Sequence, residues 1–71
     1  MDIGNGLKER RLQRGLTQEE LAARVAVTRQ TIIAIEKAKF TPSVRLALQL
    51  AQVLQTRVEE LFWLEGQVEK R

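Results

Sequence analysis

The sequence predicts an all-α protein, a compact bundle of five short helices. Apolar residues recur at three- and four-residue spacings along most of the chain. Threonine, serine, glycine and proline stand where short helices would begin and end. The 71 residues are 44% hydrophobic with one proline and four glycines, which favours a folded chain over a disordered one. We expect a single domain over residues 1–66 and a frayed tail over residues 67–71.

The first helix is expected to begin at Ile3 or Asn5 and to end at Arg14, where Gly15 can adopt the left-handed conformation that stops a helix. Leu16 should fold inward after this turn. The inward face of the helix is expected to consist of Ile3, Leu7, Leu12 and the stem of Arg11.

The next two helices are short and are joined by a tight turn. Thr17 begins the second helix, and Glu20 completes a capping box in which each side chain bonds the backbone of the other residue. The Ala26-Val27 pair forms the turn, and Thr28 begins a third helix over about residues 28–37. The inward positions are Leu21, Ala22, Val25, Ile32 and Ile35. This layout is typical of a helix-turn-helix, whose second helix can enter the major groove of DNA.

Two further helices complete the predicted bundle. Ser43, which follows Pro42, is expected to cap the fourth helix, and Thr56 is expected to cap a short fifth helix that Gly66 ends. The core stripe of the fourth helix is predicted at Val44, Ala47, Leu48, Ala51 and Leu54. The fifth helix is expected to contain Val58, Leu61 and Phe62.

The composition argues against several classes of protein. The chain has no Cys, no His and only one Ser, so it lacks disulfides, zinc-thiolate sites and the usual catalytic pairs of nucleophile and base. We therefore expect no enzyme activity, no cofactor and no metal, and no small-molecule ligand is evident. The N-terminus has no signal-peptide pattern, and no apolar stretch approaches the ~20 residues that span a membrane. We expect the protein in the cytoplasm.

The net charge of +3 is unevenly distributed along the chain. Residues 1–45 contain nine Lys or Arg against five Asp or Glu, whereas residues 46–71 contain three against four. The basic surplus coincides with the predicted helix-turn-helix, as a surface that faces phosphates requires. Charges that only solvate the surface would give the same balance.

Several motifs together make the chain similar to the Xre/Cro-type helix-turn-helix family of phage and bacterial repressors, and in particular to its small stand-alone members. They cover about residues 5–64 and are specific as a set. The motifs are Leu7-Lys8-Glu9-x-Arg11, Gly15-Leu16-Thr17-Gln18-Glu19-Glu20-Leu21-Ala22, Val27-Thr28-Arg29-Gln30-Thr31-Ile32, Ile35-Glu36, Pro42-Ser43 and Val58-Glu59-Glu60-Leu61-Phe62. The resemblance implies a lambda-repressor-like domain of five helices that binds operator DNA as a symmetric dimer and represses transcription.

The resemblance also implies which residues contact double-stranded DNA. Base contacts are expected from the third helix, through Arg29, Gln30 and Ala34, with Ile33 beside them. Gln18 is expected to anchor a phosphate at the start of the second helix. Thr31, Lys39 and Phe40 are expected along the backbone by the same resemblance. Thr28 and Lys37 are expected to contact phosphates as well, Lys37 as a general phosphate-attracting charge.

Three of these residues can also be judged by their own chemistry. Arg29 opens the third helix, where a guanidinium faces the positive end of the helix dipole, so an external anion or a guanine is its better partner. Gln30 suits the edge of an adenine, but it is equally an ordinary surface glutamine. Ile33 can contact a thymine methyl group, or it can pack against the second helix or the start of the fourth.

Two turns depart from the pattern of the family. Ala26 and Ala38 stand where glycine is common, and alanine at a positive φ costs about 1 kcal/mol relative to glycine. Either these turns are slightly strained, or the third helix runs a little further.

Glu36 lies close to the core stripe of the third helix. A buried carboxylate without a partner is costly, so we expect one. The resemblance supplies Arg11, on the inward edge of the first helix. This ion pair would be structural and would set how the first helix sits against the third.

The second half of the chain carries more apolar residues than one small core needs. Phe62, Trp63 and Leu64 are consecutive and cannot all face the same core, and aromatic side chains are typical of interfaces. We therefore expect a homodimer whose interface contains Leu46, Leu50, Val53, Phe62, Trp63 and Leu64. In the alternative, Trp63 folds back onto the first helix of a monomer.

The sequence thus predicts a sequence-specific DNA-binding transcriptional regulator. It is expected to be a repressor that binds a near-palindromic operator as a homodimer, through the third helix. The alternative is an antitoxin or an adaptor that uses the same fold to bind another protein. The Arg29-Gln30 pair on a basic face favours DNA, because such an adaptor does not need it.

Overall fold

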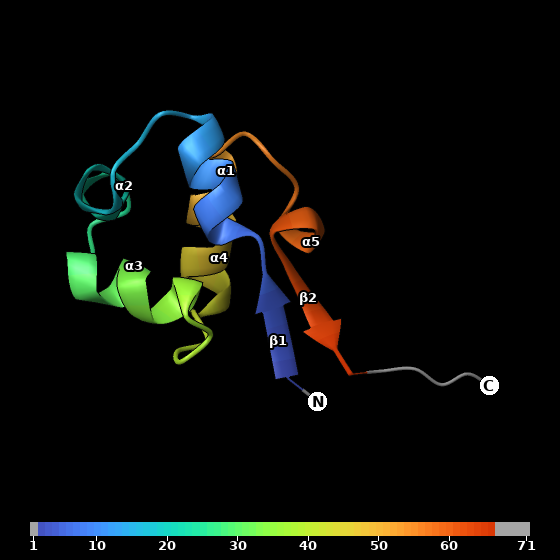
Figure 1. Cartoon of the computed structure of the whole chain (residues 1–71). Coiled ribbons are helices and arrows are strands. Elements are labelled where there is room, and N and C mark those ends of the chain that lie inside the picture. Colours follow the sequence, from blue (N-terminus) through green and yellow to red (C-terminus); the bar gives the residue numbers. More distant parts are fainter. Residues whose placement is uncertain (1, 67–71) are drawn as a thin grey trace.

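The computed structural model describes residues 2–66, so the tail predicted for residues 67–71 lies outside the described residues. Within them, five helices form the bundle of Figure 1: α1 (Leu7–Gln13), α2 (Gln18–Arg24), α3 (Arg29–Glu36), α4 (Val44–Val53) and α5 (Val58–Leu61). Two short strands, β1 (Asp2–Asn5) and β2 (Phe62–Glu65), lie beside the bundle and pair with each other. The prediction of five helices is confirmed, but the fold is not purely all-α.

Side chains from all five helices meet in a single core. Burial of one such aliphatic side chain contributes about 1.5–3 kcal/mol, so this cluster holds the short helices together. Leu16 packs against the core from the turn after α1, as predicted. The fully buried residues are Leu7, Leu21, Ile32, Ile35, Leu50 and Leu61.

Local capping signals place most of the helix starts. The capping box of α2 is complete: the backbone N–H of Glu20 donates to the Thr17 hydroxyl at 3.0 Å, and the N–H of Thr17 donates to the Glu20 carboxylate at 2.8 Å. Thr28 and Ser43 cap α3 and α4 as predicted. The prediction for Thr56 is wrong, because the N-cap of α5 is the next residue and the Thr56 hydroxyl donates to a glutamate side chain instead.

The two ends of the chain form an antiparallel two-stranded sheet that the sequence did not predict. In its register Ile3 pairs with Leu64, and Gly4 with Trp63. The first helix therefore begins at Leu7 rather than at Ile3 or Asn5, and the fifth ends at Leu61, before the Phe62 that was assigned to it. Glycine and asparagine before α1 are poor helix formers, whereas consecutive aromatic residues after α5 favour a strand.

The rotation of α4 about its own axis differs from the prediction. Val44 and Leu48, assigned to the core stripe, are 77% and 53% exposed, whereas Leu46 and Leu50, assigned to a dimer interface, are 8% and 0% exposed. Leu46 and Leu50 therefore have almost no surface to offer to a partner, and Val53 packs partly against the core. The helix is apolar on most of its circumference, so the spacing alone could not decide which side faces inward.

The unusual alanines lie at strained positions. Ala26 has a φ of 59° and Ala38 a φ of 60°, in the left-handed region that favours glycine. Since α3 ends at Glu36, the strained-turn alternative is confirmed over a longer third helix. Gly15 adopts a φ of 69° after α1, as predicted.

Candidate nucleic-acid interface

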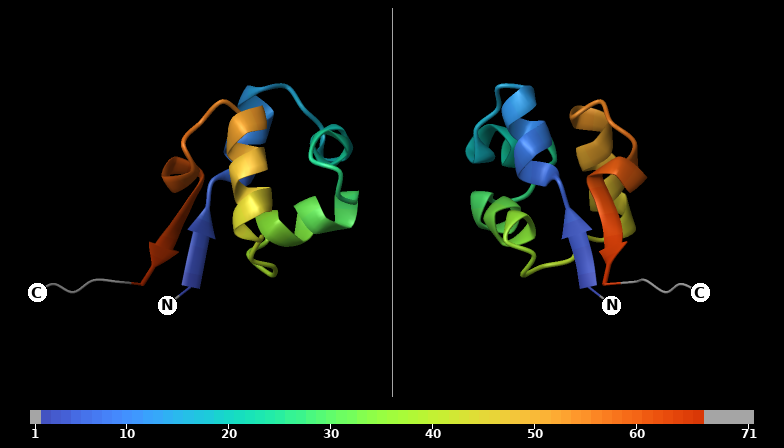
Figure 2. Two further views of the ribbon diagram at one scale, coloured as in Figure 1. Left: turned by 180° about the vertical axis from the view of Figure 1, so that it is seen from behind. Right: turned by 45° about the vertical axis from the view of Figure 1, so that its right-hand side comes forward.

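One side of α3 is anchored in the core and the other is open. Ile32 and Ile35 are 0% and 1% exposed. Arg29 and Gln30, on the first turn, are exposed. Both views in Figure 2 place α3 along an edge of the bundle, beside α2. The helix-turn-helix therefore presents its second helix outward from a rigid support.

The first turn of α3 gathers groups that can bind a phosphate or a base edge. Thr28 accepts a hydrogen bond from the backbone N–H of Thr31 at 3.3 Å, and their hydroxyls lie 3.2 Å apart. Residues 2–66 contain three ion pairs, and none of them includes Arg29. Its guanidinium is thus available to an external anion or to a guanine.

A hollow of about 440 Å³ lies between the starts of α2 and α3. Arg29 contributes a positive charge to its wall, whereas Arg11 is already paired with Glu36, and the Glu19 carboxylate reduces the charge further. Such a hollow can accept an anionic oxygen of a nucleic-acid backbone. It is lined by Arg11, Thr17, Gln18, Glu19 and Arg29.

The other predicted contact residues lie on α3 or directly after it. Lys37, Lys39 and Phe40 are exposed on the loop over residues 37–43, next to the end of α3. Ile33 and Ala34 are half-buried, so each has some surface left for a groove. The structure thus brings the predicted residues together around α3, while their contacts with DNA stay predictions.

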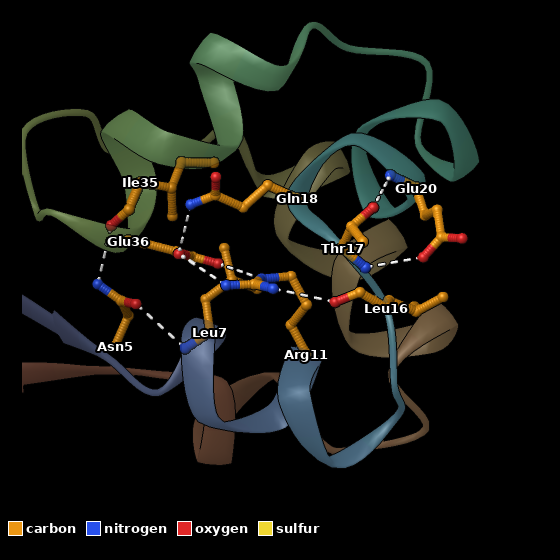
Figure 3. A network of polar contacts seen from close by, with 9 residues as sticks. All are labelled: Asn5, Leu7, Arg11, Leu16, Thr17, Gln18, Glu20, Ile35 and Glu36. Carbon is orange, nitrogen blue, oxygen red and sulfur yellow. Dashed lines mark hydrogen bonds and ion pairs between the residues drawn. The ribbon is translucent and has the colours of Figure 1, made fainter.

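The expected ion pair between Arg11 and Glu36 is present in the interior (Figure 3). Arg11 Nε donates to Glu36 Oε2 at 2.7 Å, and Arg11 Nη2 donates to Glu36 Oε1 at 3.3 Å. The two side chains are only 8% and 6% exposed. A pair with this bidentate geometry and little water around it fixes the position of α1 relative to α3.

Three hydrogen bonds near this pair, made by Gln18 and Asn5, were not predicted from the sequence. The Gln18 amide, assigned to a phosphate, donates its Nε2 to Glu36 Oε1 at 3.1 Å. Asn5 Nδ2 donates to the carbonyl of Ile35 at 3.0 Å, while Asn5 Oδ1 accepts from the N–H of Leu7 at 3.1 Å. Nothing in the sequence distinguishes Gln18 from a surface glutamine, whereas an asparagine two residues before a helix is a recognisable turn signal.

The groups whose pKa is shifted lie elsewhere, on α5 and its cap. The pKa of the Glu59 carboxyl is lowered, mainly by a hydrogen bond from its own backbone and then by Arg57. The pKa of Arg57 is raised, mainly by its hydrogen bond to Glu59.

Residues 2–66 hold no group of three or more His, Cys, Asp or Glu placed to bind a metal. None of the helices in this part of the chain is long and apolar enough to cross a membrane.

Comparison with known proteins also identifies a helix-turn-helix in this chain. A helix-turn-helix family model matches residues 7–61. An uncharacterised HTH-type transcriptional regulator of Methanothermobacter thermautotrophicus is 52% identical over 60 residues, which is 83% of this chain and 87% of that protein. Another, YgzD of Bacillus subtilis, is 46% identical over 61 residues, or 86% of this chain and 92% of that protein.

A solved structure is similar as well. The restriction-modification controller protein C.AhdI of Aeromonas hydrophila superposes with a TM-score of 0.70 and 31% identity, over 76% of this chain and 78% of that one. The relatives of Methanothermobacter thermautotrophicus and Bacillus subtilis are both HTH-type transcriptional regulators. The chain belongs to the Xre/Cro-type helix-turn-helix family of transcriptional regulators.

Proposed function

We propose that this protein is a repressor that reads a near-palindromic operator with α3. The first turn of α3 carries the proposal, because Arg29 and Gln30 are exposed there while the opposite side of the helix is fixed in the core. A guanidinium can bond guanine O6 and N7, and a glutamine amide suits the edge of an adenine. Ile33 and Ala34, which are half-buried, would contact the major groove beside Arg29 and Gln30.

Phosphate contacts on both sides of α3 would hold it in the groove. We assign them to the Thr28 and Thr31 hydroxyls, to Gln18 at the start of α2, and to the exposed loop after α3 through Lys37, Lys39 and Phe40. Such contacts set the register of the protein on DNA without reading sequence. We propose that such a regulator acts in the cytoplasm with the chromosome, which the archaeal and bacterial origin of the relatives supports.

We infer further that the protein acts as a homodimer, through a surface that keeps Trp63 and Leu64 of the predicted interface but has Val44 and Leu48 of α4 in place of the buried Leu46 and Leu50. Val44, Leu48, Trp63 and Leu64 are 77%, 53%, 40% and 58% exposed, and the first two stand four residues apart on one face of α4. Exposed apolar surface of this kind is typical of an interface. A two-fold axis there would place the two copies of α3 about 34 Å apart, in successive major grooves.

Selection of bound duplexes from a random pool tests whether the protein binds DNA sequence-specifically. The expected result is a near-palindromic consensus whose half-sites lie one helical turn apart. A pool that stays random after several rounds would contradict the proposal and would favour the antitoxin or adaptor role.

Sedimentation at increasing concentration tests the dimer. Wild type is expected to dimerise, and Leu48→Lys to remain a monomer because a charge would be buried in the interface. Leu12→Lys is the matched control, since Leu12, which was predicted to face inward, is 58% exposed and lies on α1 rather than on α4 or β2. Wild type that stays monomeric with and without operator DNA would contradict this part of the proposal.

A further inference from the structure

The side chain of Gln18 is directed toward the end of α3, as Figure 3 shows. Its Nε2 donates to Glu36 Oε1 at 3.1 Å, and the residue is half-buried. A glutamine amide has two N–H donors, so one is used inside the protein and the other remains for an external acceptor. Gln18 therefore has an internal partner in addition to any phosphate.

That partner, Glu36, is the point at which three helices are joined. Its carboxylate accepts two hydrogen bonds from Arg11 besides the one from Gln18. Arg11 in turn donates its Nη1 to the carbonyl of Leu16 at 2.9 Å. Since the Glu36 side chain is only 6% exposed, water has little access to replace a lost donor, and charge-assisted bonds are about twice as strong as neutral ones.

Because of its position in α3, Glu36 can influence residues at the other end of the helix. Glu36 is the last residue of α3, whereas Arg29 and Gln30 are its first two. A helix of eight residues is about 12 Å long, and its backbone hydrogen bonds keep its two ends at a fixed separation. Its start is attached to α2 through the turn, where the N–H of Val27 donates to the carbonyl of Ala22 at 3.0 Å. Because α3 is anchored in the core by Ile32 and Ile35, we expect a change at Glu36 to tilt the helix about these residues and to displace its first turn.

We propose that Gln18 is a positioning residue for base reading: its bond to Glu36 sets the angle of α3 between α2 and the groove. This inference rests on the proposed function and deepens it. Base-specific hydrogen bonds require placement within about 0.5 Å, so a small tilt weakens discrimination more than it weakens contacts with the phosphate backbone. A residue that only binds a phosphate would affect all DNA sequences equally.

The substitution Gln18→Met tests this, because methionine keeps the length of the side chain and removes both donors. Affinity is measured for the selected operator and for a scrambled duplex of equal length and composition. The operator-to-scrambled ratio is expected to fall about tenfold, the size of effect that one hydrogen bond to a charged group produces. Equal loss on both duplexes would overturn the inference. Gln52→Met, an exposed glutamine on α4, is the matched control and should leave the ratio unchanged.

A second measurement needs no DNA. In ¹H–¹⁵N spectra of the free protein, Gln18→Met is expected to shift the backbone amide signals of Gln30 and Thr31, which lie on the first turn of α3 and outside the hollow that Gln18 shares with Arg29. Shifts confined to the surroundings of residues 18 and 36 would overturn the inference. If wild type prefers no DNA sequence, the proposed function fails, whereas the spectra still decide whether Gln18 positions α3.

Discussion

The indole of Trp63 occupies the space that a side chain at Gly4 would need. The two residues are paired across the β1–β2 sheet, and a Cβ atom built on Gly4 would overlap Trp63 and Glu65. Trp63 Nε1 donates to Glu65 Oε2 at 2.8 Å, which fixes the ring in this place. The absence of a side chain at residue 4 therefore lets the aromatic ring lie on the opposite strand and join the two ends of the domain.

Gly4→Ala is expected to displace Trp63 and to lower the free energy of unfolding by about 1–3 kcal/mol, the usual cost of an added group in a filled space. The chain has one tryptophan, so its fluorescence during urea unfolding reports both effects. Gly6→Ala is the control, because a Cβ there would lie 3.7 Å from the same ring, an ordinary contact. Equal stability of the two variants would show that the ring does not need Gly4.

Ala26→Gly is expected to raise the free energy of unfolding by about 1 kcal/mol, because it relieves the positive φ of the turn between α2 and α3. Ala23→Gly, on the exposed side of α2, is expected to lower it by about 1 kcal/mol, since glycine destabilises a helix interior. Thermal or urea unfolding measures both. Changes of the same sign would argue against strain at Ala26.

Glu36→Ala is expected to lower the free energy of unfolding by about 3–5 kcal/mol, because it leaves the buried Arg11 without its carboxylate. Replacing Arg11 by Met in the same chain should recover part of this loss, since no unpaired charge then remains. A double-mutant cycle in urea measures the coupling. Additive effects of the two substitutions would contradict a stabilising ion pair.

Arg29→Ala and Gln30→Ala are each expected to cost about 1–3 kcal/mol of discrimination at one base position per half-site. The reason is their exposure on the first turn of α3. Binding is measured against the operator and its single-base variants. Arg24→Ala removes an equal charge from α2 and is the control, expected to weaken binding without changing base preference. If both α3 variants kept the base preference of wild type, the assignment of Arg29 and Gln30 as base contacts would be wrong.

Short-range signals in the sequence were enough to find the helix-turn-helix. The Thr17–Glu20 capping box and the caps at Thr28 and Ser43 act within one helical turn, so the residues that form them are neighbours in the chain. The inward spacing of Ile32 and Ile35 likewise follows from the geometry of a single helix. The pair of Arg11 and Glu36 was expected through resemblance to a family rather than from spacing.

Only the tertiary structure decided the features that depend on contacts between distant segments. The sequence placed apolar residues around most of α4, and the packing of the other helices selected Leu46 and Leu50 for the core while leaving Val44 and Leu48 outside. The β1–β2 pairing joins residues about 60 positions apart, and neither four-residue strand would be stable alone. The bond from Gln18 to Glu36 likewise exists because α2 and α3 pack against each other, and no local pattern encodes it.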